Sequence, residues 1–169
     1  MFNKKGFTII ELMIVLAIIS VVLTIAISSM ANTVQHLRLN SAAGELMSNI
    51  NRARMTAIAR NGNCVISFNK AENSYMIFMD DDSSGLVSWQ KDEAEDMLAS
   101  KAMPSGITIA KASFSLGTSA FGYSGNGLPL GNRIGSVCLK NDKDEYYKLS
   151  VSWTGRPRLY RNVKKSECI

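Results

Sequence analysis

The pattern of hydrophobic residues divides the chain into two parts with different periods. Residues 7–27 read FTIIELMIVLAIISVVLTIAI, an apolar run in which Glu11 is the only charged residue. As a helix this run would be roughly 31 Å long, which matches the hydrocarbon core of a bilayer. Lys4 and Lys5 precede it, and positive charges favour the cytoplasmic side of a membrane. The pattern predicts a single membrane-spanning helix with its short N-terminal end in the cytoplasm.

Helical spacing continues beyond the apolar run. Apolar residues recur three or four positions apart, and the arginines of this segment lie largely off the stripe formed by Met30, Val34, Leu37, Leu46, Ile50, Ala53 and Ala57. Residues 61–63, Asn-Gly-Asn, then provide a stop, with Gly62 available for the left-handed position after a helix. We therefore expect one helix from Phe7 to about Arg60, whose second half packs on a domain.

Beyond residue 62 the apolar period changes to about two, which is typical of strands. We expect strands at 64–68, 75–79, 106–110, 113–116, 119–122, 134–139 and 146–153. A short polar segment joins the first two, and the polar turn at 141–145 joins the last two, so each of these pairs should form a hairpin. The predicted fold is α+β, with a long N-terminal helix packed on an antiparallel β-sheet domain.

Composition narrows the class of protein. The 169 residues include 3 cysteines, 3 prolines and 12 glycines, and 46% are hydrophobic, which excludes a collagen, a disulfide-dense mini-protein and a disordered chain. Only one apolar run is long enough to cross a bilayer, so a multi-span membrane protein is excluded as well. A secretory signal peptide would have a shorter apolar core and a cleavage site of small residues, which leaves a plain signal anchor as the simplest interpretation.

Glu11 argues against a plain anchor, because a carboxylate inside a membrane span is costly unless it has a partner. Residues 6–12, GFTIIEL, followed by the apolar helix, resemble the class III signal of type IV pilins and pseudopilins. In that family a dedicated prepilin peptidase cuts after the glycine and methylates the new N-terminal residue. The resemblance implies cleavage between Gly6 and Phe7, methylation of Phe7, and pairing of Glu11 with the N-terminal amine of a neighbouring subunit during assembly.

The same resemblance implies how the chain is organised and where it acts. Residues 1–6 would be a leader, residues 7–30 the transmembrane and assembly half of the helix, and residues 31–169 a periplasmic globular domain. The protein would cross the bacterial inner membrane once and later enter a pilus at the cell surface. Its implied partners are the prepilin peptidase, the inner membrane and the other pilins of the fibre.

Several later segments resemble one branch of this family, the FimT/FimU/GspH-type minor pilins and pseudopilins. These segments are Tyr75–Asp80, Phe121–Gly125, Ser136–Cys138 and Val151–Arg156. The branch serves both type IV pili and type II secretion, and a GspH-like pseudopilin would have the same N-terminus. The resemblance therefore favours a minor pilin that helps pilus assembly and leaves a type II secretion pseudopilin as the alternative.

The cysteines, at 64, 138 and 168, lack the spacing of a zinc site or of a CxxC motif. In an oxidising periplasm two of them can pair, and the sequence leaves the pairs 64–138, 64–168 and 138–168 open. Many minor pilins tether their C-terminal segment with a disulfide, so the resemblance favours Cys138–Cys168, with Cys64 as a buried thiol. Closing that loop of about 31 residues would contribute roughly 3–4 kcal/mol, chiefly through the unfolded state.

The C-terminal end is strongly basic, with Trp153 and Tyr160 close to the charges. Arginine contacts phosphate bidentately, and aromatic rings stack on bases. Residues 155–158, Gly-Arg-Pro-Arg, resemble the G-R-x-R motif of FimT-type pilins, at the family's position after the last strand; that motif is implicated in capturing DNA for natural transformation. The resemblance implies DNA binding through Arg156 and Arg158, and Arg161, Lys164 and Lys165 would support the positive field around them. Because such arginines mainly contact phosphates, we expect no strong sequence preference. The alternative is a solvated tail on a purely structural pilin.

No motif points to catalysis or to a cofactor. The single histidine, His36, lies in the predicted helix, and paired carboxylates occur only in an acidic loop. Residues 80–85, DDDSSG, begin like a calcium-binding loop, but Lys91 stands at the twelfth position, where a bidentate glutamate is needed. We expect a solvated loop there, with bound calcium as the alternative. The sequence predicts a protein that is not an enzyme and holds no metal or cofactor.

Overall fold

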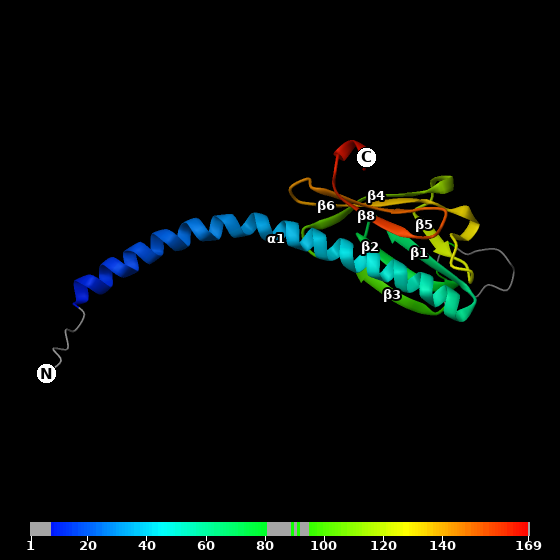
Figure 1. Ribbon diagram of the computed structural model, residues 1–169, viewed down its shortest axis with the longest axis horizontal. Coiled ribbons are helices and arrows are strands. Elements are labelled where there is room, and N and C mark those ends of the chain that lie inside the picture. Colours follow the sequence, from blue (N-terminus) through cyan, green and yellow to red (C-terminus); the bar gives the residue numbers. More distant parts are fainter. Residues whose placement is uncertain (1–7, 81–88, 90, 92–94, 169) are drawn as a thin grey trace. The chain divides into compact units, whose positions relative to one another are not determined.

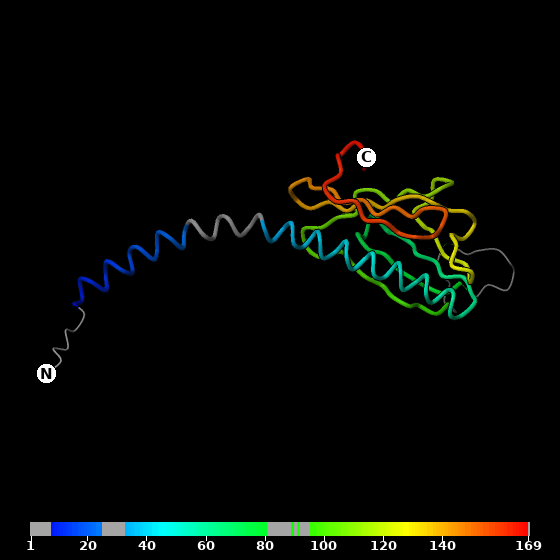
Figure 2. Tube along the Cα trace, in the orientation of Figure 1, coloured from blue at the N-terminus to red at the C-terminus, as the bar shows by residue number. Residues whose placement is uncertain are grey.

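The computed structural model describes residues 8–80, 89, 91 and 95–168, without the side chains of 25–32; the remaining segments are grey in Figure 2. The chain divides into two compact units, Met1–Gln35 and His36–Ile169. The predicted leader, the cleavage site between Gly6 and Phe7, and residues 81–85 of the predicted calcium loop lie outside the described residues.

Helix α1 (Ile9–Arg60) begins with a capping arrangement that we did not predict from the sequence. The backbone N–H of Glu11 donates to Thr8 Oγ1 at 3.3 Å, and the N–H of Leu12 donates to the Thr8 carbonyl oxygen at 3.2 Å. Thr8 and Glu11 have the spacing of a capping box, in which the glutamate supports the first turn. This hydrogen bond uses the backbone of Glu11 and not its carboxylate, whose role stays the one that the resemblance implies.

In the first unit the large apolar side chains from Ile9 to Leu23 are exposed. No helix within the described part of the chain is both long enough and apolar enough to cross a membrane. The predicted transmembrane segment 7–30 begins and ends in residues that the structure does not fully describe, and it stays a prediction.

In the second unit α1 buries one stripe of side chains, namely Leu39, Ala42, Ala43, Leu46, Ile50, Ala53 and Ala57. These residues follow the three- and four-residue spacing of one helix face. The predicted stripe was correct from Leu46 onwards and wrong at Val34 and Leu37, which are exposed, and the side chain of Met30 lies outside the described residues. Leu37 lies two positions before Leu39 and therefore points to the opposite side of the helix.

The helix ends where we predicted, but with a different residue in the left-handed position. Asn61 adopts a φ of 48°, and the N–H of Gly62 donates to the Ala57 carbonyl oxygen at 3.1 Å. The N–H of Asn61 also donates to the Ile58 carbonyl oxygen at 3.3 Å. These two bonds form a Schellman motif, in which asparagine can replace glycine. The expectation that Gly62 takes this position was wrong.

The rest of the second unit is two four-stranded antiparallel sheets (Figure 1). Sheet A has the order β3-β2-β1-β5 and sheet B the order β4-β6-β7-β8. The strands are β1 (Asn63–Asn69), β2 (Ser74–Asp80), β3 (Met97–Ala102), β4 (Ile107–Phe114), β5 (Ala120–Tyr123), β6 (Gly135–Asn141), β7 (Tyr146–Val151) and β8 (Pro157–Val163). Short 3-10 turns occur at Ser115–Gly117, Leu130–Asn132 and Lys165–Glu167.

The predicted hairpins β1–β2 and β6–β7 are confirmed, and so is the α+β class. The two strands expected between 106 and 116 are one strand, β4, with a bulge between Ile109 and Lys111. Both strands that the sequence analysis missed, β3 and β8, lie at sheet edges. An edge strand has only one neighbour and a largely exposed surface, so it lacks the apolar alternation that reveals a half-buried strand.

The core lies between the buried stripe of α1 and the inner faces of the two sheets. Where β4 and β5 approach each other, the rings of Phe114 and Phe121 stack with centroids 4.6 Å apart. Cys64 on β1 is a free thiol that is fully buried, as predicted. Burial raises the pKa of this thiol to about 12, although the nearby charge of Arg60 lowers it, so Cys64 stays protonated and unreactive at neutral pH.

Candidate nucleic-acid interface

The basic C-terminal segment forms the edge strand β8 of sheet B; the expectation that it follows the last strand was wrong. In the β7–β8 hairpin, orange to red in Figure 2, Val151 lies opposite Pro157 and Ser150 lies opposite Arg158. Pro157 stands at the first position of an edge strand, where a missing N–H is tolerated. Arg158 is therefore held by a sheet rather than by a mobile tail.

The turn between β7 and β8 is fixed by a glycine and by an arginine of α1. Gly155 has a φ of +74°, and its N–H donates to the Ser152 carbonyl oxygen at 2.8 Å. Arg54 donates through Nε to the Gly127 carbonyl oxygen at 2.8 Å and through its guanidinium to the Thr154 carbonyl oxygen at 3.3 Å. The helix, the Gly127 loop and the turn are thus tied together. This role of Arg54 could not be predicted from the sequence.

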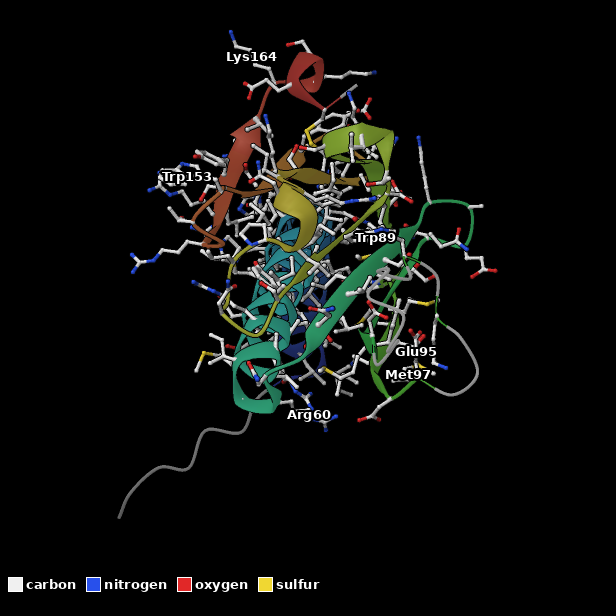
Figure 3. All side chains as sticks on the ribbon, turned by 90° about the vertical axis from the view of Figure 1, so that its right-hand side faces the viewer. Arg60, Trp89, Glu95, Met97, Trp153 and Lys164 are labelled. Carbon is white, nitrogen blue, oxygen red and sulfur yellow. A yellow bond between two sulfur atoms is a disulfide. The ribbon has the colours of Figure 1, made fainter. Side chains whose placement is uncertain are left out.

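Arg156 and Arg158 are exposed, and neither side chain forms an ion pair or a hydrogen bond with another described residue. Two exposed aromatic side chains accompany them, Trp153 at 72% and Tyr160 at 47% exposure. Arg158 and Tyr160 are two positions apart in β8 and therefore point to the same face of the sheet. Figure 3 shows Trp153 directed away from the domain. The end of the hairpin thus presents two uncompensated arginines beside two aromatic rings.

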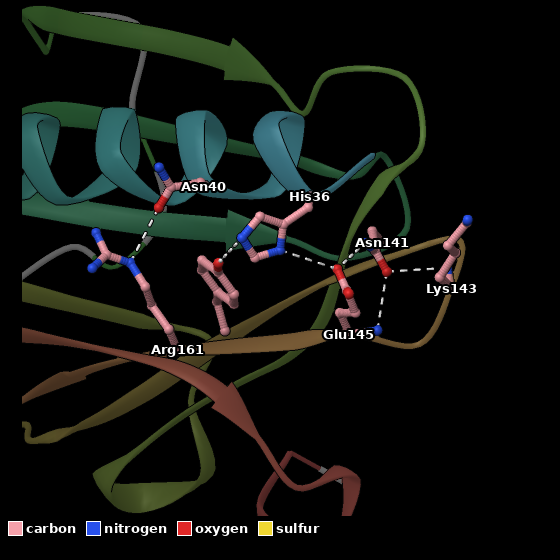
Figure 4. Close-up of polar contacts among 7 residues, drawn as sticks. His36, Asn40, Asn141, Lys143, Glu145 and Arg161 are labelled. Atoms are coloured by element: carbon pink, nitrogen blue, oxygen red, sulfur yellow. Dashed lines mark hydrogen bonds and ion pairs between the residues drawn. The ribbon is translucent and has the colours of Figure 1, made fainter. Parts of the chain in front are cut away.

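The structure does not bring the other predicted cations to the same place. Arg161 turns toward α1, where its Nε donates to Asn40 Oδ1 at 3.1 Å (Figure 4). Lys164 and Lys165 follow the far end of β8, and Lys164 points into solvent in Figure 3. Lys165 Nζ lies 4.0 Å from a carboxylate oxygen of Asp144. The five predicted cations therefore occupy three separate positions.

The disulfide Cys138–Cys168 is present, as the resemblance implied, with the two Cα atoms 5.7 Å apart. Both cysteines are buried. Cys138 lies on β6, so the bridge fastens the turn Lys165–Glu167 to the face of sheet B that points away from α1 (Figure 1). Lys148 Nζ also lies 3.6 Å from a carboxylate oxygen of Glu167.

The remaining titratable groups do not form a catalytic arrangement. His36 Nδ1 lies 3.5 Å from Glu145 Oε2, and its Nε2 lies 3.5 Å from the hydroxyl of Tyr147 (Figure 4). These contacts connect α1 to β7 at the surface. Among the described residues no group of three histidine, cysteine or acidic side chains could hold a metal ion. Asp80, at the start of the predicted calcium loop, is buried at the end of β2.

Replacing Gly155 with alanine should destabilise the domain by about 2–3 kcal/mol. A non-glycine residue at this φ costs about 1–2 kcal/mol, and the new Cβ would lie 2.6 Å from the Gly127 carbonyl oxygen. The strain and the clash should both act, because the contacted atom is backbone that Arg54 holds in place. Thermal unfolding of Gly155→Ala measures the loss.

Gly117 offers a matched control for this substitution. Its φ is +71°, but a Cβ there would meet no atom within 4 Å. Gly117→Ala should therefore show only the conformational cost, about 1–2 kcal/mol. Equal destabilisation by the two substitutions would contradict the close approach of Gly155 to the Gly127 loop.

Two sequence families match the chain. Residues 1–27 match the prokaryotic N-terminal methylation motif, and residues 42–155 match the family described as type II transport protein GspH. No curated protein matches the sequence significantly.

Solved structures share the fold at low sequence identity. The type IV minor pilin FimU of Pseudomonas aeruginosa is 19% identical, with a TM-score of 0.57 over 77% of this chain and 93% of its own. The minor pseudopilin EpsH of the Vibrio cholerae type 2 secretion system is 13% identical, with a TM-score of 0.54 over 75% of this chain and 99% of its own.

The methylation motif stands at the start of the chain, and the second family match covers more than half of it. The structural matches cover about three quarters of the chain and show the same fold in a pilin and in a pseudopilin. The protein belongs to the GspH family and is a minor pilin or pseudopilin.

Proposed function

We propose that the protein is a minor pilin of a type IV pilus that binds DNA at the end of the β7–β8 hairpin. Arg156 and Arg158 are the residues that would contact DNA, with Trp153 and Tyr160 as stacking partners. The observation that carries this proposal is the pair of exposed arginines without an ion-pair partner among the described residues, on a hairpin fixed by Gly155 and Arg54. Arginines already paired with carboxylates would bind a phosphate more weakly.

The expected interaction is with the DNA backbone. Phosphate contacts supply most non-specific affinity, whereas base edges in the grooves supply sequence preference. An edge hairpin with two arginines has neither a helix nor a ribbon of polar side chains to place in the major groove. Binding should therefore be independent of sequence, and Arg161, Lys164 and Lys165 should contribute mainly through the local potential, because they lie elsewhere on the surface.

The N-terminal part of the chain would anchor the protein in the membrane and join it to the fibre. We propose that the peptidase cuts between Gly6 and Phe7, that Phe7 is methylated, and that residues 7–30 hold the protein in the inner membrane before it enters the fibre. The match of residues 1–27 to the methylation motif supports this processing. The exposed apolar side chains from Ile9 to Leu23 support burial of this segment in lipid or in a helical bundle. The C-terminal domain would then lie in the periplasm.

Replacing Arg156 and Arg158 together with glutamine should weaken DNA binding and make it less dependent on salt. Each phosphate contact contributes about −0.9 to the slope of log K against log salt concentration, so losing two contacts should flatten the slope by up to roughly 2. The full-length protein in a nonionic detergent can be titrated with fluorescent duplex DNA at several salt concentrations. Parent affinity should be micromolar or weaker.

Arg38 and Arg52 provide a control with the same change in net charge. Both are exposed on α1, and neither side chain forms a hydrogen bond or an ion pair with a described residue of the hairpin. Arg38→Gln/Arg52→Gln should leave the slope nearly unchanged, because these arginines would contribute only to the overall field. Equal losses of DNA affinity and of salt dependence in the two double variants would show that net charge, and not the hairpin, governs binding. That result would contradict the proposal.

A second function is favoured by the names of two matches. The family is described as type II transport protein GspH, and EpsH belongs to a type 2 secretion system. In that case the protein would be a structural subunit of a pseudopilus, and DNA binding would be unnecessary. Deleting the gene would then reduce protein secretion and leave surface pili and transformation intact.

A further inference from the structure

A cavity of about 750 Å³ opens on the face of sheet B that points away from α1. Residues of β4, β6 and β7 form its floor. The β1–β2 turn forms one wall, and the C-terminal turn held by Cys138–Cys168 forms another. This volume is typical of small-molecule sites. The cavity does not include any residue of the DNA-binding hairpin end proposed above.

The charge of this cavity is strongly positive. Four lysines from four different elements line it, and none of the described lining residues is acidic: Lys70, Lys111, Lys140 and Lys165. Asp144 approaches from outside the lining, with carboxylate oxygens 3.7 Å from Lys140 Nζ and 4.0 Å from Lys165 Nζ. One carboxylate thus faces two ammonium groups, and Lys70, Lys140 and Lys165 exceed this carboxylate by two positive charges among the described residues, with Lys111 left out of the count.

A threonine in the wall has an unsatisfied hydroxyl. Ile107 and Ile109 point into the core, so Thr108 between them points to the cavity side of β4. Its Oγ1 is shielded from solvent and forms no hydrogen bond with any described residue. Lys140 lies directly opposite Thr108 in the neighbouring strand. A buried hydroxyl without a partner is costly, and a rotation of the Thr108 side chain that brings its hydroxyl to an acceptor beside Lys140 would remove that cost.

We propose that this cavity binds a phosphate ester. A phosphate monoester carries nearly two negative charges and several acceptor oxygens, which match several lysines and a hydroxyl better than a single carboxylate does. Lysine binds phosphate as a flexible point charge, and Lys140 and Lys165 can turn from Asp144 to the ligand. Ala71, Ala110 and Cys168 give the wall apolar surface for the organic part of the ligand.

The phosphate can come from a free small molecule or from the end of a DNA strand, and the probes distinguish these sources. Titration calorimetry of the full-length protein in nonionic detergent would use inorganic phosphate, a 5′-phosphorylated tetranucleotide and the same tetranucleotide with a 5′-hydroxyl. Saturable binding of inorganic phosphate would support a free phosphate. Binding of the phosphorylated tetranucleotide alone would support a DNA end. The proposal would be overturned if inorganic phosphate did not bind and the two tetranucleotides bound with equal affinity.

Three substitutions locate the binding in this cavity. Thr108→Val removes only the hydroxyl, should leave the fold intact because that hydroxyl has no partner, and should weaken phosphate binding about tenfold. Lys140→Gln should weaken it by a similar factor. Asp144→Asn frees both lysines, keeps a residue that tolerates the φ of 57° at this position, and should strengthen binding several-fold. Unchanged binding in all three variants would overturn the proposal.

Arg156→Gln/Arg158→Gln separates this inference from DNA binding by the hairpin. That variant should bind inorganic phosphate as tightly as the parent, because neither arginine lines the cavity. If this variant lost as much affinity for inorganic phosphate as Lys140→Gln does, phosphate would bind at the hairpin, and the cavity proposal would be overturned. A failure of the duplex DNA experiment, with phosphate still bound here, would overturn only the proposed function.

Discussion

Glu11→Ala should be processed and inserted into the membrane normally but should be nearly absent from assembled fibres. Alanine removes a costly charge from an apolar segment, so insertion should not suffer. In the proposed assembly the carboxylate pairs with the N-terminal amine of a neighbour, and removing one partner of a buried pair costs about 3–5 kcal/mol. Such a loss corresponds to at least about a hundredfold less incorporation. Immunoblots of sheared fibres and of membranes measure the two pools.

Glu11→Gln separates the negative charge of this residue from its position in the first turn of α1. Glutamine can replace glutamate in a capping box with Thr8, but it has no charge. If the charge pairs with a neighbour, Glu11→Gln should fail to assemble, as Glu11→Ala does. Normal incorporation of the glutamine variant would assign Glu11 to helix capping and contradict the pairing.

Intact mass of the membrane form provides the control for processing in both variants. Loss of residues 1–6 and one added methyl group on Phe7 should be seen in the parent and in each variant. A protein that still begins at Met1 would contradict the proposed cleavage after Gly6. In a type II secretion machine the same Glu11 variants should instead lower secretion.

Removing the disulfide should destabilise the domain by roughly 3–4 kcal/mol. This is the free-energy equivalent of the conformational entropy that the unfolded chain gains when a loop of about 31 residues is opened. The loop from Cys138 to Cys168 includes β7, β8 and the C-terminal turn, so the reduced chain gains freedom over the whole basic hairpin. The melting temperature of Cys138→Ala/Cys168→Ala should fall by about 10 °C. Thermal unfolding with and without reductant measures this loss.

The third cysteine serves as the internal control. Cys64 is fully buried, and its raised pKa keeps it in the unreactive thiol form. Alkylation of the folded, oxidised protein should therefore modify no cysteine, and alkylation after unfolding should modify Cys64 alone. Reductant should lower the melting temperature of the parent and leave that of the double variant unchanged. An equal effect of reductant on both proteins would contradict a stabilising Cys138–Cys168 bridge.

Much of the fold followed from local pattern. A helix buries a stripe and a central strand buries alternate residues, so Leu46 to Ala57, β1, β2, β6 and β7 could be predicted from apolar spacing. The start of the stripe could not, because an isolated Leu37 and the buried Leu39 look alike in sequence. Which of them is covered depends on where the sheets begin to pack on α1.

The edge strands and the candidate site show a different limit. β8 has the sequence PRLYRNV, in which proline and charges conceal a strand that exists because β7 offers it a partner. The sequence identified Arg156, Arg158 and their aromatic neighbours as one basic segment. It did not separate them from Arg161, because only the pleat of β8 and the position of Asn40 send that side chain toward α1.

From the sequence alone we could predict the family, the long helix, the α+β class and the residues that could pair or bind. These properties follow from motifs and from periodicity, which are local in the chain. Packing in three dimensions was needed to establish that Cys138 pairs with Cys168, that Arg54 fixes the turn at Gly155, and that Thr108 and four lysines share one cavity. Each of these depends on contacts between residues distant in sequence, and such contacts arise only when the sheets and the helix pack together.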